Sequence, residues 1–260
     1  MSKLQELGFL SDEAKESEAD IVQDFVRVFD LFDKLSVLFI DALSNAKIEP
    51  ESTEGLVIHA AAARALELSQ SADILLRKGC VPAAKLVCRT QLEAVYKLCA
   101  IIKNSDLAHE YISQSKFSRL QKLKSIQKYQ QDYPDSKAAP NLTKEIDELS
   151  VAAKSLKKLA PHDWASKAEM DDFHRVYYQG LSDDTHGNIE TLDHYFDKNS
   201  DYAFCFGPSV QDLNIVAHAC QRGMVNAIIH YTSYVGNSNP EILKPISDEV
   251  DQALYDSDAG

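Results

Sequence analysis

The chain has 260 residues, 45% of them hydrophobic and 26% charged. This is the composition of a folded protein long enough to bury a core without disulfides or metals. The formal net charge of −13 argues against general nucleic-acid binding, because phosphate contact needs clustered Lys and Arg. Only 9 Gly and 8 Pro interrupt the chain, which favours long helices.

Neither targeting nor membrane insertion is indicated. The first residues contain no apolar signal segment, and no apolar run is long enough to span a membrane. The cysteines are odd in number and lack CxxC spacing, so we expect reduced, packed thiols at Cys80, Cys88, Cys99, Cys205 and Cys220. These features predict a cytoplasmic protein with no membrane contact.

The first long periodic segment covers about 17–43. Its apolar residues, from Ile21 to Phe39, follow the three- and four-residue spacing of an amphipathic helix. Ser17 and Asp20 resemble a capping box with the shorter acid, which places the helix start at Ser17.

Two further helices follow closely. The second is expected over about 53–78 and ends before Gly79. The third is expected over about 81–103, with Pro82 in its first turn. Because the third helix is apolar nearly all round, we expect it to be central in the fold.

The fourth and fifth helices are more polar. They are expected over about 106–131 and 141–159, separated by a loop at 132–140. In this part of the chain Asp106 and Glu110 oppose a larger set of cations, so a local basic face is predicted in an acidic protein. The cations are Lys103, Lys116, Arg119, Lys122, Lys124 and Lys128.

The remaining sequence predicts short helices at about 168–180 and 187–196, a long core helix at about 209–235 and a last short helix at about 240–255. No run alternates in the manner of a strand. We therefore predict an all-α protein of about eight to nine helices in one bundle, with a loose C-terminal tail. The expected organisation is a single domain over 1–260, with its core in 17–103 and 164–235 and a helical excursion at 104–160.

Arg89 and Glu93 are the first candidate site residues. They lie four residues apart, hence on one face of the third helix, beside Leu86 and Tyr96. A charged pair among such neighbours is expected to be partly buried. Two interpretations stay open: an ion pair that fixes helix packing, or a site in which Arg89 binds an anion and Glu93 orients it or acts as a base.

The segment 177–187 is the second candidate. If it is one helix, Tyr178, Ser182 and His186 lie on one face at steps of four. If the helix breaks near Gly180, Ser182 or Asp183 becomes the N-cap of the following helix, and His186 lies in the first turn of that helix. The plain alternative is capping together with a hydrogen-bonded histidine.

Metal binding and a serine nucleophile are weaker interpretations. His186, Glu190 and His194 also have helical spacing, but no HExxH motif or matching ligand pair occurs elsewhere, so no metal is expected. No GxSxG elbow accompanies the serine and histidine. Other polar residues lie in apolar helices and are expected to be core residues: His59, Arg64, His218, Arg222 and His230. No cofactor is expected.

The chain resembles a bacterial all-helical family known only as a domain of unknown function. The residues that carry the resemblance are Gly79, Arg89, Glu93, Trp164, Tyr178, Ser182 and His186. The resemblance covers roughly residues 55–200. It implies that Arg89, Glu93, Ser182 and His186 come together in space.

This family is also distantly similar to HEPN helical domains, many of which are metal-independent ribonucleases of toxin and phage-defence systems. HEPN nucleases carry Arg and His in one R-x(4–6)-H motif, and this chain has none. The likeness therefore implies the helical scaffold and does not extend to the catalytic motif of HEPN nucleases.

Two functions follow as hypotheses. In the first, Arg89, Glu93 and His186 form a phosphate-directed catalytic site, Tyr178 and Ser182 position the ligand, and the basic fourth helix guides RNA. In the second, the cluster is structural and the chain is a non-catalytic interaction module for a protein partner or a second copy. Long helices with apolar stripes fit such a homodimer.

Overall fold

The computed structural model describes residues 7–47, 51–133, 142–153, 158–181, 195–197, 203–204 and 207–256. Ten α-helices occupy most of these residues, which confirms the all-α class with slightly more helices than expected. The long helices are α2 (Asp12–Asp24), α3 (Val26–Ser44), α4 (Thr53–Arg77), α5 (Val81–Lys103), α6 (Asp106–Asp132), α7 (Leu142–Ala153), α11 (Leu213–Tyr234) and α12 (Pro240–Asp256). The shorter elements are a 3₁₀ turn (Gly8–Leu10), α8 (Pro161–Lys167), α9 (Asp171–Phe173), a π-helix (His174–Tyr178), β1 (Phe196–Asp197) and β2 (Ala203–Phe204).

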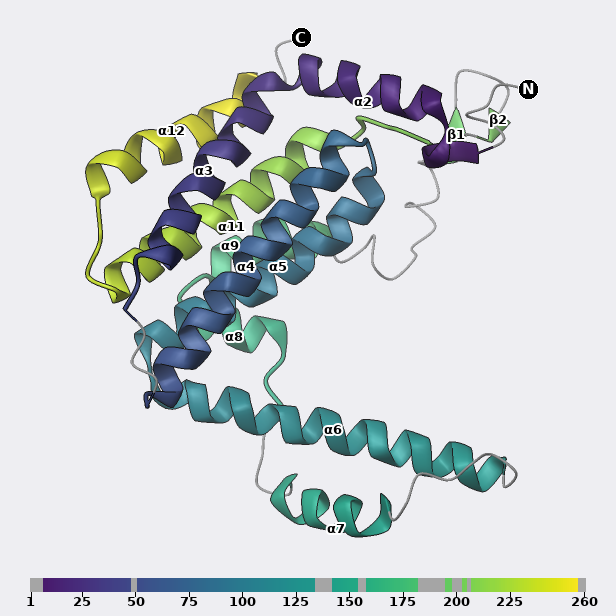
Figure 1. Ribbon diagram of the computed structural model, residues 1–260, viewed down its shortest axis with the longest axis vertical. Coiled ribbons are helices and arrows are strands. Elements are labelled where there is room, and N and C mark those ends of the chain that lie inside the picture. The colour runs from purple at the N-terminus through teal and green to yellow at the C-terminus, as the bar shows by residue number, and fades with distance from the viewer. Residues whose placement is uncertain are drawn as a thin grey trace.

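Helices α3, α4, α5 and α11 pack against one another to form the bundle (Figure 1). Helix α2 crosses one end of the bundle, and α12 packs against α3 and α11. At the opposite end, α6 extends away from the bundle with α7 beside it (Figure 1). Helix α8 packs against α5, next to the start of this extension.

The main core is formed by the apolar faces of the bundle helices. On α3 the predicted spacing buries Phe32, Leu35 and Phe39 completely. Helix α5 is buried over most of its circumference, as its apolar sequence predicts, because α4, α11, α8 and α6 all contact it. A second, smaller apolar cluster joins α6 to α7 and contains Leu120, Ile146 and Ala153.

Gly223 on α11 lies directly against Gln91 on α5. A Cβ atom there would lie 2.5 Å from Nε2 of Gln91, a side chain that is fully buried. The Gln91 amide donates to Ser69 Oγ and to the Cys220 carbonyl, each at 3.3 Å. A side chain at position 223 would therefore displace a buried amide from both of its acceptors.

The N-terminal helix differs from its prediction. The expected helix over 17–43 begins earlier and is divided at Phe25, whose φ and ψ are −110° and 29°. Ser11, not Ser17, caps the start, since its hydroxyl accepts from the Ala14 amide. Ser17 instead donates to the Glu13 carbonyl within the helix. No Gly or Pro marks this division, so the spacing of apolar residues could not predict it.

Gly79 ends α4 for a clear geometric reason. Its amide donates to the Leu76 carbonyl and the next amide donates to Leu75, which together form a Schellman motif. The φ of Gly79 is +66°, in the left-handed region that favours glycine. A Cβ atom there would also lie 2.8 Å from the Ser209 backbone nitrogen. The predicted end of the second helix is confirmed.

Two other expectations need adjustment. The helix expected over 141–159 is described as α7 only to Ala153, and α8 begins at Pro161. In place of one helix over 168–180 the chain forms α9 and the π-helix. Two-residue strands form one small antiparallel pair, with Phe196 in register with Phe204, and the class remains all-α. Most of the helix expected at 187–196 lies outside the described residues.

Four cysteines lie in the described part of the chain, and all four are free thiols. Cys88, Cys99 and Cys220 are fully buried, and burial raises the pKa of Cys99 to about 12. Cys205 lies outside the described residues. In the part of the chain that the structure describes, no helix is both long and apolar enough to cross a membrane.

Substitution of Gly223 by Ala tests the contact between α5 and α11. We expect Gly223→Ala to lower the free energy of unfolding by about 1–3 kcal/mol, because the new methyl group overpacks a buried site. Gly180→Ala is the matched control, since no atom lies within 4 Å of its added Cβ. Chemical denaturation that gives both variants equal stability would contradict this account.

Buried histidines predict a loss of stability in acid. His59 and His218 are 9% and 6% exposed, and burial lowers the pKa of each below the ordinary value of about 6.5. The unfolded chain therefore binds more protons, and the free energy of unfolding falls as the pH drops from about 6.5 through the lower folded-state values. Denaturant melts should show a flatter pH dependence for His218→Gln. The same substitution at the exposed His109 is the control.

Candidate functional site

The Arg89–Glu93 pair forms one side of an interhelical contact with Tyr178. The Tyr178 hydroxyl donates to Glu93 Oε1 at 2.8 Å. The guanidinium carbon of Arg89 lies 5.0 Å from the centre of the Tyr178 ring, within the range of a cation–π contact. The structure thus brings Arg89, Glu93 and Tyr178 together, although they come from α5 and from the π-helix.

The π-helix places Tyr178 in an aromatic cluster. Its ring stacks on His174 with centroids 4.5 Å apart, and Tyr96 lies 6.2 Å away. Tyr178 is 6% exposed, and burial together with the hydrogen bond to Glu93 raises its pKa. Burial also lowers the pKa of His174. These shifts favour the neutral forms of both rings, so the cluster is packed mainly through neutral surfaces.

Ser182 and His186 lie outside the described residues. Their predicted roles, ligand positioning for Ser182 and acid–base chemistry for His186, therefore stay predictions. The same holds for the metal spacing of His186, Glu190 and His194. Within the described residues, no group of His, Cys, Asp or Glu is arranged to hold a metal ion.

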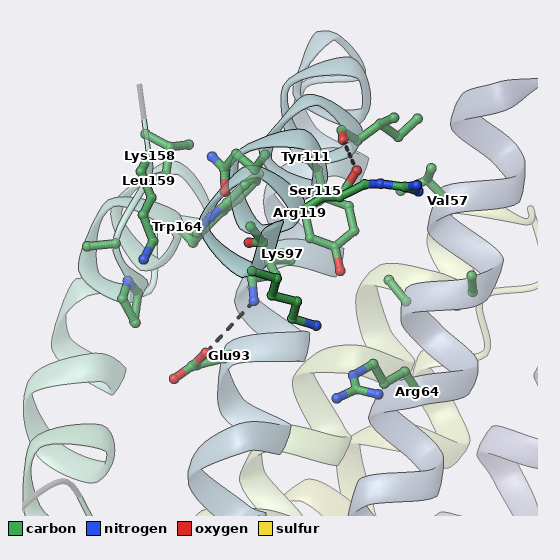
Figure 2. Close-up of a pocket in the computed structure, with 18 of the residues that line it drawn as sticks. Val57, Arg64, Glu93, Lys97, Tyr111, Ser115, Arg119, Lys158, Leu159 and Trp164 are labelled. Atoms are coloured by element: carbon green, nitrogen blue, oxygen red, sulfur yellow. Dashed lines mark hydrogen bonds and ion pairs between the residues drawn. The ribbon is translucent and has the colours of Figure 1, made fainter. Parts of the chain in front are cut away.

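Glu93 also lines a large cleft. The cleft has a volume of about 1520 Å³ and lies between α4, α5, α6 and the start of α8 (Figure 2). The charged residues that line it are one carboxylate and five cations: Glu93, Arg64, Lys97, Arg119, Lys122 and Lys158. In a chain of net charge −13 this is a local concentration of positive charge.

Lys97 is half-buried, with its side chain 25% exposed, whereas the other four cations of the cleft are exposed. Burial lowers its pKa, Glu93 opposes this effect, and the charge of Arg64 adds to it. The Glu93 Oε2 atom lies 3.9 Å from Lys97 Nζ, which is an ion pair longer than a hydrogen bond. On its other side, Lys97 Nζ lies 5.9 Å from the centre of the Tyr111 ring. Lys97 is therefore held between a carboxylate and an aromatic ring.

Helix α6 supplies two of the cations predicted for its basic face. Arg119 and Lys122 point into the cleft region, and Arg119 also pairs with Glu145 of α7 through a hydrogen bond of 2.6 Å. That pair is largely solvent-exposed, with side chains 66% and 37% exposed, so it contributes little to stability. Arg119 therefore lines the cleft while its guanidinium is paired with Glu145.

The sequence interpretation missed part of this site. Arg64 was expected in the core, but it is exposed and lines the cleft. The sequence does place Arg64 on the same face of α4 as Val57, Ala60 and Ala61, because these residues are spaced by three, four and seven positions. That spacing could have indicated a shared surface. Lys97 likewise continues the four-residue spacing of Arg89 and Glu93. The other core expectations hold in part: His59 shares a hydrogen bond of 2.5 Å with Tyr231, whereas His218 makes only a 3.6 Å contact to Asp251.

The contact between Tyr178 and Glu93 can be tested by removing one oxygen atom. We expect Tyr178→Phe to lower the free energy of unfolding by about 1 kcal/mol, because a partly buried carboxylate oxygen loses its donor while the ring stays on Arg89. Tyr129→Phe on α6 is the control, since Tyr129 is 57% exposed. Equal thermal melts of the two variants would show that the hydrogen bond is not structural.

Comparison with known proteins gives one match. A family of unknown function, DUF5677, matches residues 55–203. No curated protein and no solved structure matches the chain. The matched segment begins near the start of α4 and extends to β2, so it contains every residue that lines the cleft as well as Arg89 and Tyr178. Because the match covers more than half of the chain, the protein belongs to the DUF5677 family of unknown function.

Proposed function

We propose that this protein binds phosphate-bearing ligands, with RNA as the expected class, in the cleft between α4, α5, α6 and α8. The observation that carries the proposal is the set of five cations against one carboxylate around a cleft of about 1520 Å³. Clustered Lys and Arg are what phosphate binding requires, and the acidity of the remaining chain limits binding to this one face.

The cleft also offers surfaces other than charge. Tyr111 and Trp164 line it with their rings at 88° and centroids 5.9 Å apart, and Leu123 and Ile126 add apolar area. Other proteins bind single-stranded RNA in grooves that combine cations with aromatic rings. The mixture of side chains therefore supports a flexible, single-stranded polyanion more than a compact inorganic ion.

Arg64 and Lys122 provide the test of binding. We expect Arg64→Ala and Lys122→Ala to weaken binding of a short single-stranded RNA regardless of its sequence. The slope of log Kd against log salt should fall by about 1 for each cation removed, because each neutralises one phosphate. Fluorescence anisotropy of labelled RNA over a range of salt concentrations measures both quantities.

Lys144→Ala is the matched control for this experiment. It removes the same charge from α7, where Lys144 is 78% exposed and does not line the cleft. If the control weakens RNA binding as much as the cleft variants do, the attraction is general and the cleft is not the site. If the unchanged protein binds no RNA at all, RNA is excluded as the ligand.

Catalysis is a separate part of the proposal. Glu93 reaches both the cleft and the Tyr178 contact, so it is the predicted acid–base residue best placed to meet a bound ligand. Arg89 does not line the cleft and acts here as a positioning residue for Tyr178. Incubation of RNA with the unchanged protein, Glu93→Gln and His186→Ala tests cleavage. Equal cleavage by all three proteins would show that neither Glu93 nor His186 takes part in the reaction.

The role in stress or phage defence implied by the HEPN likeness stays a prediction.

A non-catalytic interaction module is the second candidate. The observation that favours it is the α6–α7 extension, which projects from the bundle (Figure 1) and exposes large apolar side chains. Ile126, Tyr129 and Val151 are 45%, 57% and 68% exposed there. Light scattering of the purified protein over a range of concentrations tests the homodimer form of this candidate. A constant monomer mass would exclude it.

A further inference from the structure

Two hydrogen-bond donors in the wall of the cleft find no acceptor among the residues that the structure describes. Trp164 Nε1 and Gln114 Nε2 are buried and make no hydrogen bond to any part of the chain that the structure describes. The Trp164 side chain is almost wholly enclosed, with the residue 1% exposed. An unmet buried donor costs about 1–3 kcal/mol, so an acceptor from outside the chain, such as a ligand oxygen, would stabilise this wall.

The two donors belong to one wall. The Tyr111 ring on α6 packs edge-on against Trp164 on α8, at an angle of 88°. Gln114 follows Tyr111 by three residues and therefore lies on the same face of α6. Lys158 precedes α8, and Figure 2 shows it with Leu159 and Trp164 on that side of the cleft. Two neutral donors and one cation thus line the same region.

The chemistry of this wall selects an acceptor with several oxygen atoms. An indole N–H can only donate, and a lysine ammonium can only donate. The one carboxylate that lines the cleft, Glu93, is on α5 and already accepts from Tyr178. A phosphate monoester carries three unesterified oxygens and a higher charge than a diester, so it can accept from all three donors together.

We propose that Trp164, Gln114 and Lys158 form a seat for a phosphate monoester, namely the terminal phosphate of the ligand that the cleft binds. This inference rests on the proposed binding function and narrows its ligand to a phosphorylated end. The same chemistry is found in a free mononucleotide and in a 5′-phosphorylated RNA, and the experiment separates these sources.

Trp164 is the single tryptophan of the chain, so its fluorescence reports directly on the seat. The full chain is titrated with inorganic phosphate, a 5′-mononucleotide, a 5′-phosphorylated single-stranded RNA and the same RNA with a 5′-hydroxyl. We expect each phosphomonoester to change Trp164 emission. We also expect the phosphorylated RNA to bind about tenfold more tightly than the hydroxyl form, since a charge-assisted hydrogen bond has that magnitude.

Variants assign the effect to the donors. Trp164→Phe keeps an aromatic ring and removes the N–H, and Gln114→Leu removes the amide at nearly constant volume. Each should reduce the tenfold preference for phosphorylated RNA, measured by anisotropy as the ratio of the affinities for the phosphorylated and the hydroxyl RNA. Gln121→Leu is the control, because Gln121 is exposed on α6 and does not line the cleft. If Trp164→Phe fails to fold, Gln114→Leu alone decides.

The outcomes separate the two proposals. Equal affinity for phosphorylated and hydroxyl RNA, with unchanged Trp164 emission on addition of phosphate, would overturn the seat and leave the cleft as an RNA site. Binding of the mononucleotide without binding of either RNA would support the seat and reject RNA as the ligand. If Trp164→Phe and Gln114→Leu both keep the preference for phosphorylated RNA, the proposed phosphate seat is also wrong.

Discussion

Burial of helix α5 is the constraint on which the rest of the structure depends. Four helices contact it, and Gln91, Leu92, Val95, Tyr96 and Leu98 leave no accessible surface for water. Arg89, Glu93 and Lys97 follow one partly buried stripe of α5 at steps of four residues. A helix enclosed in this way must place each charge beside a partner, because an unpaired buried charge would cost several kcal/mol.

The three charged residues of that stripe have different partners. Some of these contacts hold helices together, and others belong to the cleft. Arg89 meets the face of Tyr178, which ties α5 to the π-helix. Glu93 accepts from Tyr178 on one oxygen and also lines the cleft. Lys97 faces the cleft beside Tyr111. Along α5, the charged residues thus begin with a packing contact at Arg89 and end in the wall of the cleft at Lys97. Glu93 takes part in both.

The sequence alone determined the helical class and the course of the central helices. The spacing in α4 and α5, the glycine after α4 and Pro82 at the start of α5 gave boundaries within a residue of those observed, because local capping and φ restrictions act over a few residues. The same local reasoning placed Arg89 and Glu93 on one face. It was wrong at Phe25, where the helix divides without Gly or Pro to mark it, and at Ser17, which does not cap the chain.

Only the tertiary structure decided what the charged residues do. The cleft draws Arg64, Lys97, Arg119 and Lys158 from four segments far apart in the sequence, and no periodicity within one helix can show that they meet. Trp164 was visible in the sequence as part of a family resemblance, but its unmet donor depends on how α6 packs against α8. Helix formation follows from neighbours in the chain, whereas a binding surface follows from helix packing, which depends on contacts over long sequence separations.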